Sequence, residues 1–203
     1  MADELTADEI RALLKLEPNA TCGFVQLTYV STQSIAAGGL QPPFANARPM
    51  GSALYFMVTP TAPVRLHRIR NDQLYHYYLG DPLEVLLLHD GGATERVVVG
   101  PDLRGGERVQ LLIPGNTFHT ARLLGRRRWF LGASTEWPGV VPADVEIGDV
   151  EKLAAKYPVL PPICARSRPP FERPEALRAK AAHPSFVPAR RSTHGIASAA
   201  SPR

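Results

Sequence analysis

The sequence predicts an all-β protein, a sandwich or barrel with short helices at its ends. Between residues 24 and 134, short runs rich in Val, Leu, Ile, Phe and Tyr recur at regular spacing. Turn sequences such as Gly80-Asp81-Pro82 and Pro114-Gly115-Asn116 separate these runs. Evenly spaced strands without intervening helices are typical of a β-sandwich or barrel.

The elements follow in order along the chain. Thr6 and Glu9 fit a capping box, and apolar residues follow at helical spacing, so a leading helix should end near Lys15. Residues 35–49 are expected to form a long loop, and a second helix is expected at residues 150–157, between the cap Asp149 and the breaker Pro158. The predicted strands cover residues 24–30, 53–58, 64–69, 74–79, 83–88, 95–99, 109–113, 118–123 and 128–133.

Composition divides the chain into three parts: a helical lead-in at residues 1–15, a β-barrel domain at 16–160 and a tail at 161–203. The tail is rich in Pro, Arg and Ala and poor in large apolar residues, which predicts disorder. Of the net charge of +4, residues from 165 onward carry +6, from eight basic and two acidic side chains, so the folded part is not basic. DNA binding is therefore a poor fit.

The two cysteines, Cys22 and Cys164, are far apart and indicate neither a zinc motif nor a disulfide framework. The acidic N-terminus lacks the pattern of a signal peptide, and no apolar run is long enough to span a bilayer. A cytoplasmic protein is expected.

Two histidine-bearing segments carry the functional signal. They are residues 67–76 (HRIRNDQLYH) and residues 106–119 (GERVQLLIPGNTFH). Together they resemble the two motifs of the cupin superfamily, G-x5-H-x-H-x3-4-E-x6-G and G-x5-P-x-G-x2-H, whose histidines and glutamate bind a divalent metal. His67 and His119 match the first and last histidines, whereas Ile69 stands at the second histidine and Gln73 at the glutamate.

The closest resemblance is to the cupin-5 family, a domain of unknown function, over roughly residues 10–158. The most specific block is residues 72–84 (DQLYHYYLGDPLE). The chain departs from the family where Asn19-Ala20-Thr21-Cys22-Gly23 replaces H-P-E-G-G, and where Gln73 replaces glutamate. The resemblance implies a double-stranded β-helix (a jelly-roll cupin barrel), usually a homodimer, with a pocket for a small organic molecule.

The two pocket histidines are the candidate catalytic residues. An imidazole that titrates near neutrality can take and give protons, so His119 is the first choice as general base and His67 the second. Either could instead satisfy a buried backbone group. The sequence identifies no definite cofactor, but His67, Gln73 and His119 could bind a divalent metal (Fe, Mn, Ni or Zn), with the neutral amide as a weak ligand.

Further side chains are candidates for substrate binding. Gln73, Tyr75 and Tyr77 share one strand face, which His76 should not share. Arg48 could hold a carboxylate or phosphate, or be a solvated loop residue. The candidate substrate-binding residues are Arg48, Tyr55, Gln73, Tyr75, Tyr77, Gln110 and Phe118.

Three functions remain open at this point. The leading hypothesis is an isomerase, cyclase or lyase that uses the two histidines for proton transfer on a small molecule, in a secondary-metabolic or other biosynthetic role. The alternatives are a metal-dependent cupin oxygenase and a non-catalytic cupin that binds a small ligand. No nucleic acid or membrane partner is expected.

Overall fold

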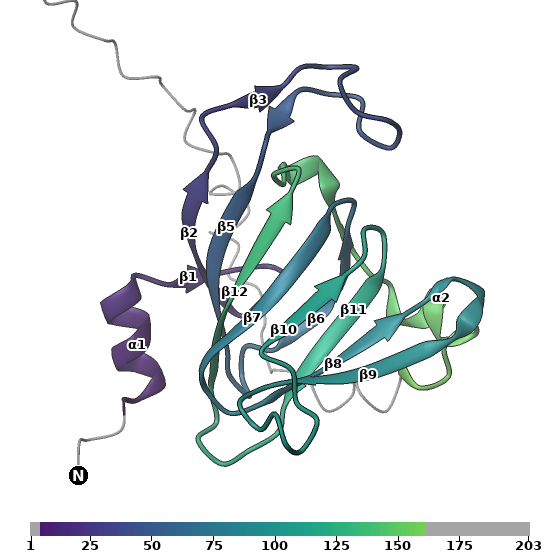
Figure 1. The fold of residues 1–203 in the computed structure, drawn as a ribbon. Helices are drawn as coiled ribbons and strands as arrows, with labels where there is room; N and C mark the ends of the chain where they lie inside the picture. The colour runs from purple at the N-terminus through teal and green to yellow at the C-terminus, as the bar shows by residue number, and fades with distance from the viewer. Residues whose placement is uncertain (1–4, 161–203) are drawn as a thin grey trace, which may run out of the picture. The chain divides into compact units, whose positions relative to one another are not determined.

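Antiparallel strands make up most of the structure, a computed structural model that describes residues 5–160 (Figure 1). The first sheet, sheet A, has the order β1-β2-β5-β12-β7-β10, and the second, sheet B, has the order β13-β6-β11-β8-β9. Two short strands, β3 and β4, form a separate pair. The all-β jelly-roll prediction is therefore confirmed.

The strand boundaries follow the runs of β-prone residues closely. Sheet A contains β1 (Glu17–Pro18), β2 (Phe24–Val30), β5 (Ser52–Val58), β7 (Asp72–Gly80), β10 (Gln110–Ile113) and β12 (Phe130–Trp137). Sheet B contains β6 (Val64–Ile69), β8 (Leu83–Leu88), β9 (Thr94–Val99), β11 (Phe118–Leu123) and β13 (Val145–Ile147). All nine predicted strands are present, and the largest difference is in β12, which continues to Trp137.

Two α-helices and two 3-10 turns complete the fold. They are α1 (Ala7–Leu14), α2 (Val150–Ala154), η1 (Asp90–Gly92) and η2 (Pro142–Asp144). Thr6 and Glu9 form the predicted capping box on α1, and Lys15 ends the helix in a left-handed conformation. Asp149 caps α2 as predicted, but that helix ends at Ala154, before the predicted end at 157. The predicted loop at 35–49 is closed by pairing of β3 (Ser34–Ile35) with β4 (Arg48–Pro49).

The main core lies between the two sheets. Phe56, Tyr75 and Phe130 from sheet A pack with Val64, Val85 and other side chains from sheet B. A second apolar cluster joins α1 to Met57, Trp129 and Leu131 on the outer face of sheet A. A third joins α2 and the residues after it to Leu66, Leu86 and Leu88 on the outer face of sheet B. Each helix thus covers one outer face, as Figure 1 shows.

The inner faces position the functional side chains. Because successive side chains alternate between the faces of a strand, His67, Gln73, Tyr75 and His119 all point into the space between the sheets. The predicted disordered tail at 161–203 lies outside the described residues. Among residues 5–160, no helix is long and apolar enough to cross a membrane.

Candidate functional site

His67 and His119 are cross-strand partners at the centre of sheet B. The register of β6 and β11 places them directly opposite each other, with ring centroids 4.2 Å apart. Both are buried, with exposed fractions of 2% and 0%. The two imidazoles that are 52 positions apart in the sequence therefore share one buried site, as predicted from the motifs.

Backbone carbonyls orient both rings in the same way. His67 Nδ1 lies 2.7 Å from the Arg65 carbonyl oxygen, and His119 Nδ1 lies 3.2 Å from the Thr117 carbonyl oxygen. A carbonyl oxygen can only accept a hydrogen bond, so each Nδ1 carries the proton. The Nε2 atom of each ring is consequently the one that faces the other side chains of the site.

His119 is held as a neutral base. The Tyr75 hydroxyl donates to His119 Nε2 over 3.1 Å, and Gln73 Nε2 lies 3.4 Å from the same nitrogen. Burial, reinforced by the positive charge of nearby His67, lowers the pKa of His119 well below its ordinary value. The ring therefore presents a lone pair to its surroundings at neutral pH.

Cys22 lies beside His67 and raises its pKa. Cys22 Sγ lies 3.9 Å from His67 Nε2 and 3.7 Å from the Tyr75 hydroxyl. Burial acts to lower the pKa of His67, but the Cys22 thiolate and the Arg65 carbonyl outweigh it, so the pKa is raised. Burial likewise acts to raise the pKa of Cys22, but His67 outweighs it, so that pKa is lowered. The two groups thus favour an imidazolium and a thiolate.

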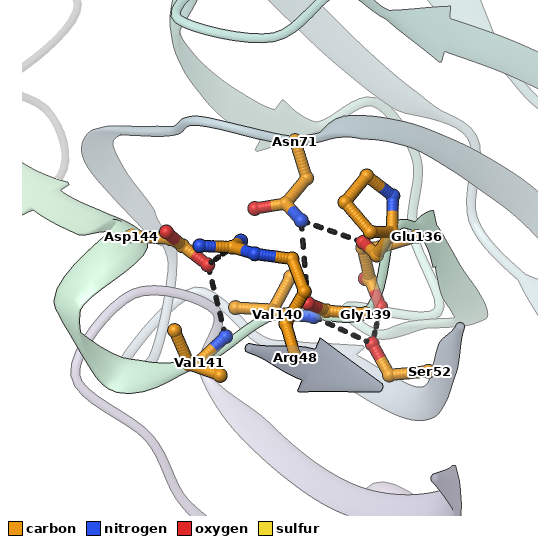
Figure 2. Close-up of polar contacts among 9 residues, drawn as sticks. Arg48, Ser52, Asn71, Glu136, Gly139, Val140, Val141 and Asp144 are labelled. Atoms are coloured by element: carbon orange, nitrogen blue, oxygen red, sulfur yellow. Dashed lines mark hydrogen bonds and ion pairs between the residues drawn. The ribbon is translucent and has the colours of Figure 1, made fainter. Parts of the chain in front are cut away.

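A chain of polar side chains leads from Gln73 along sheet A. The Ser134 hydroxyl lies 3.5 Å from Gln73 Oε1 and donates to Glu136 over 2.5 Å. Ser52 donates to the other oxygen of Glu136 over 2.6 Å and accepts from the Val140 backbone amide (Figure 2). Burial raises the pKa of Glu136 in spite of these hydrogen bonds. Contacts through Ser134 and Gln73 thus connect this carboxyl group to His119.

Arg48 belongs to a different polar cluster. Its guanidinium forms an ion pair with Asp144 at 2.9 Å, and both side chains are at most 2% exposed (Figure 2). Asp144 also accepts from the Val141 backbone amide, and the Arg48 guanidinium lies over the Phe44 ring. Arg48 is therefore a buried residue paired with Asp144 and not a solvated loop residue.

The structure brings four of the predicted site residues together: His67, Gln73, Tyr75 and His119. Tyr77 also points inward, toward Phe130, but its hydroxyl donates to the Gly80 carbonyl instead of reaching the histidines. His76 lies on the opposite face of β7, as predicted, and contacts Thr135. The shared strand face of Gln73, Tyr75 and Tyr77 is thus confirmed.

Three residues expected beside the histidines lie elsewhere. Tyr55 packs on the outer face of sheet A near Tyr78. Gln110 is exposed and contacts His76, its register partner on that same face. Phe118 packs on the outer face of sheet B, under the Arg68 guanidinium.

The reason for these corrections is the orientation of each strand. Phe118 precedes inward-pointing His119, and Tyr55 precedes inward-pointing Phe56, so alternation turns both outward. Gln110 faces outward because it pairs with outward-pointing His76. The expectation that these three side chains line the histidine site was therefore wrong.

The donor set does not fit a resident metal. Gln73 contributes a neutral amide, and the Tyr75 phenol already contacts the inward nitrogen of His119. Across residues 5–160, no three His, Cys, Asp or Glu side chains are arranged to hold a metal ion.

The sequence interpretation missed Cys22, Ser134 and Glu136. A signal existed for Glu136, since an acidic residue within the apolar run of β12 is buried only with polar partners. For Cys22 the departure from the family block was visible in the sequence, but its bridge to Val64 and its approach to His67 arise from the pairing of distant segments.

Comparisons with known proteins agree with this architecture. A family model described as Cupin_5, cupin superfamily (DUF985), matches residues 8–148. A protein from Shewanella oneidensis of known structure is 24% identical with a TM-score of 0.69, and the match covers 85% of this chain and 100% of that chain. A hypothetical protein from Leishmania major is 25% identical with a TM-score of 0.68, covering 76% and 94%. Comparison with curated proteins found no match.

Proposed function

Because the chain belongs to the Cupin_5 family of the cupin superfamily, we propose that it binds a small organic molecule and catalyses proton transfer on it. The reaction class is that of an isomerase, cyclase or lyase. His119 acts as the general base and His67 as the general acid. This assignment is based on the arrangement of the site, since the family as such has no assigned reaction.

The observation that carries the proposal is the close approach of two buried imidazoles whose pKa values shift in opposite directions. Their centroids are 4.2 Å apart, yet the pKa of His119 is lowered and that of His67 is raised. Neighbouring groups whose environments separate their pKa values can serve as a base and an acid at the same pH. A pair of histidines that only satisfied backbone groups would not need this difference.

The roles of the neighbouring side chains follow from their contacts. His119 Nε2 takes a proton from an acidic carbon of the substrate, while His67 Nε2 delivers a proton to another substrate atom. Tyr75 and Gln73 contact His119 Nε2, so both must move aside or share this nitrogen when the substrate arrives. The His67 and His119 rings are buried, so binding also requires displacement of neighbouring side chains.

Solvent deuterium exchange tests the proposal without knowledge of the product. Small carbonyl compounds with acidic α-hydrogens are incubated with the protein in deuterium oxide and followed by proton NMR. We expect exchange with at least one compound, a loss of exchange in His119→Gln and a reduction in His67→Gln. His89→Gln is the matched control, because His89 lies outside the site, on the turn after β8, and contacts Glu95.

A second candidate is a ligand-binding cupin without turnover, which the near-complete burial of both rings favours. With the same compounds, such a protein would exchange no hydrogen in deuterium oxide, but a separate thermal unfolding measurement would show a rise in melting temperature on binding. That result would replace the catalytic proposal. A metal-dependent oxygenase is not supported by the donor set, and metal analysis of the purified protein checks this.

The other expectations from the sequence stay predictions. They are the homodimer, the biosynthetic role and the cytoplasmic location. Sedimentation equilibrium tests the first, with a mass of twice 22.2 kDa expected.

A further inference from the structure

We infer that Cys22 is a nucleophile of this site, paired with His67, and that it adds reversibly to the β-carbon of an α,β-unsaturated carbonyl compound. The inference rests on the proposed small-molecule site and extends it by a covalent step and a substrate class. It concerns this chain in particular, because Cys22 stands where the family block H-P-E-G-G has a glycine.

The geometry is that of an activated nucleophile. Cys22 Sγ lies 3.9 Å from His67 Nε2, and the Arg65 carbonyl holds His67 Nδ1 at 2.7 Å. Cys22 is thus the nucleophile, His67 is the base beside it, and the Arg65 carbonyl orients that base. This is the set of groups that activates catalytic cysteines. The Tyr75 hydroxyl also lies 3.7 Å from the sulfur, although its single proton is donated to His119 Nε2.

The backbone around Cys22 is fixed in place. Asn19 Oδ1 accepts hydrogen bonds from the Thr21 amide, the Thr21 hydroxyl and the Cys22 amide, at 2.9, 2.8 and 3.2 Å. Gly23 has a φ of +54°, and a Cβ there would lie 2.3 Å from the Met57 carbonyl oxygen, so only glycine fits. Together with the bridge from Cys22 to Val64, these contacts aim the sulfur at the histidine pair.

The charges of the surrounding groups agree with a thiolate. The pKa of Cys22 is lowered by His67 despite burial, and that of His67 is raised by Cys22. The pKa of Tyr75 is raised well above its ordinary value by burial and by the Cys22 charge, so the phenol keeps its proton. Because the pKa of His119 is lowered, this ring stays neutral and does not oppose a positive charge on His67.

The addition step balances without a second reactant. The thiolate forms a bond from Sγ to the β-carbon, and the electron pair of the C=C bond moves toward the carbonyl as an enolate. The Tyr75 hydroxyl leaves His119 Nε2 and donates its hydrogen bond to the enolate oxygen, and His67 Nε2 gives its proton to the α-carbon. Loss of a proton from the α-carbon to His67 and departure of the thiolate restore the double bond, in either geometry after rotation.

This chemistry suits the site better than acyl transfer. Acyl transfer from Cys22 would require water or another acceptor to release the acyl group. Addition followed by elimination returns the same thiolate and imidazolium, so it is complete with the groups present. It also gives an isomerisation, in agreement with the proposed reaction class.

The test uses the full chain with acrylamide, an α,β-unsaturated amide, as the probe. Peptide mass spectrometry follows adduct formation at Cys22 against pH, with Cys164 as a second thiol in the same molecule. We expect Cys22 in the folded protein to react faster at about pH 6 than Cys22 in the urea-unfolded chain, because a lowered pKa increases the fraction of the thiol that is present as thiolate. We expect His67→Gln to abolish this advantage and His89→Gln to retain it.

A second measurement does not require acrylamide to reach Cys22 and does not use the His67 variant. The ultraviolet absorbance of the thiolate, taken as wild type minus Cys22→Ser, should appear at lower pH in the folded than in the unfolded chain. The inference is overturned if Cys22 resists acrylamide while Cys164 reacts, or if the thiolate appears only at the pH of an ordinary thiol. Acetylation of Cys22 by p-nitrophenyl acetate without acrylamide addition would overturn the substrate class.

These outcomes separate the inference from the proposed function. Deuterium exchange that survives in Cys22→Ser would leave the proton-transfer proposal standing and remove the covalent step. A reactive Cys22 thiolate in a protein that exchanges no hydrogen would support the covalent step and remove the proton-transfer proposal.

Discussion

His67 and His119 face each other across neighbouring strands at a ring separation of 4.2 Å, and each donates Nδ1–H to the carbonyl two residues earlier in the chain. The pKa values of these two rings nevertheless shift in opposite directions. Burial and the charge of His67 lower the pKa of His119, whereas Cys22 beside His67 outweighs burial and raises the pKa of His67.

The first prediction concerns the order of titration of these two rings. In an NMR titration of the imidazole nitrogens, His119 should protonate at lower pH than His67. His67→Gln should raise the pKa of His119, because a positive neighbour is removed. Equal midpoints, or His119 protonating first, would contradict the assignment of base and acid.

The second prediction concerns stability at acidic pH. The pKa of His119 is lower in the folded protein than its ordinary 6.5, so below pH 6.5 the unfolded chain binds a proton that the folded chain does not. This contribution to stability is present above pH 6.5 and is lost as the pH falls toward the folded pKa, at up to about 1.4 kcal/mol per pH unit. Urea unfolding of wild type and His119→Gln from neutral to acidic pH measures it. A difference between the two that does not change with pH would refute it.

The third prediction concerns the buried ion pair between Arg48 and Asp144. Asp144→Asn should lower the free energy of unfolding by about 3–5 kcal/mol, because it leaves the Arg48 charge buried without a counter-charge. The matched control is Glu146→Gln, which breaks the exposed pair with Arg68 and should change stability by about 0–1 kcal/mol. Urea unfolding compares the two variants. Equal effects would show that burial does not determine how much each ion pair contributes to the free energy of unfolding.

The fourth prediction concerns the start of α1. Thr6→Ala removes the side chain that caps Glu9 and should lower the free energy of unfolding by about 1 kcal/mol. Thr6→Ser retains the hydroxyl and should lose much less. Since α1 buries Ile10 against Met57, Trp129 and Leu131, hydrogen exchange should show the helix opening more often in the alanine variant. An unchanged exchange rate would mean that packing alone holds the helix.

Much of the fold could be predicted because its determinants are local. Turn sequences such as Gly80-Asp81-Pro82 end one strand and start the next, and the capping residues Thr6 and Asp149 define where the helices begin. The positions of His67, Gln73 and His119 in the family motifs also predicted that these side chains would converge, as they do. The end of α2 was overestimated, because apolar spacing continued past the last helical residue.

The parts of the site that could not be predicted depend on strand orientation and on distant pairing. Both faces of β5 are apolar, so composition could not show that Phe56 points inward and Tyr55 outward. The outward position of Gln110 follows from its register with His76, and register is a property of two strands, not of one.

By itself, the sequence determined the order and type of the predicted elements, because turns and strand composition depend on residues that are close in the chain. It also predicted that two imidazoles share one site, because their segments match the family motifs. Only the tertiary structure decided which side chains surround those imidazoles and in which direction the pKa of each ring shifts. Cys22 lies 45 positions before His67 along the chain, and 3.9 Å from it in space. A pKa responds to distance, burial and partner charge, and these are set when the sheets close around the core.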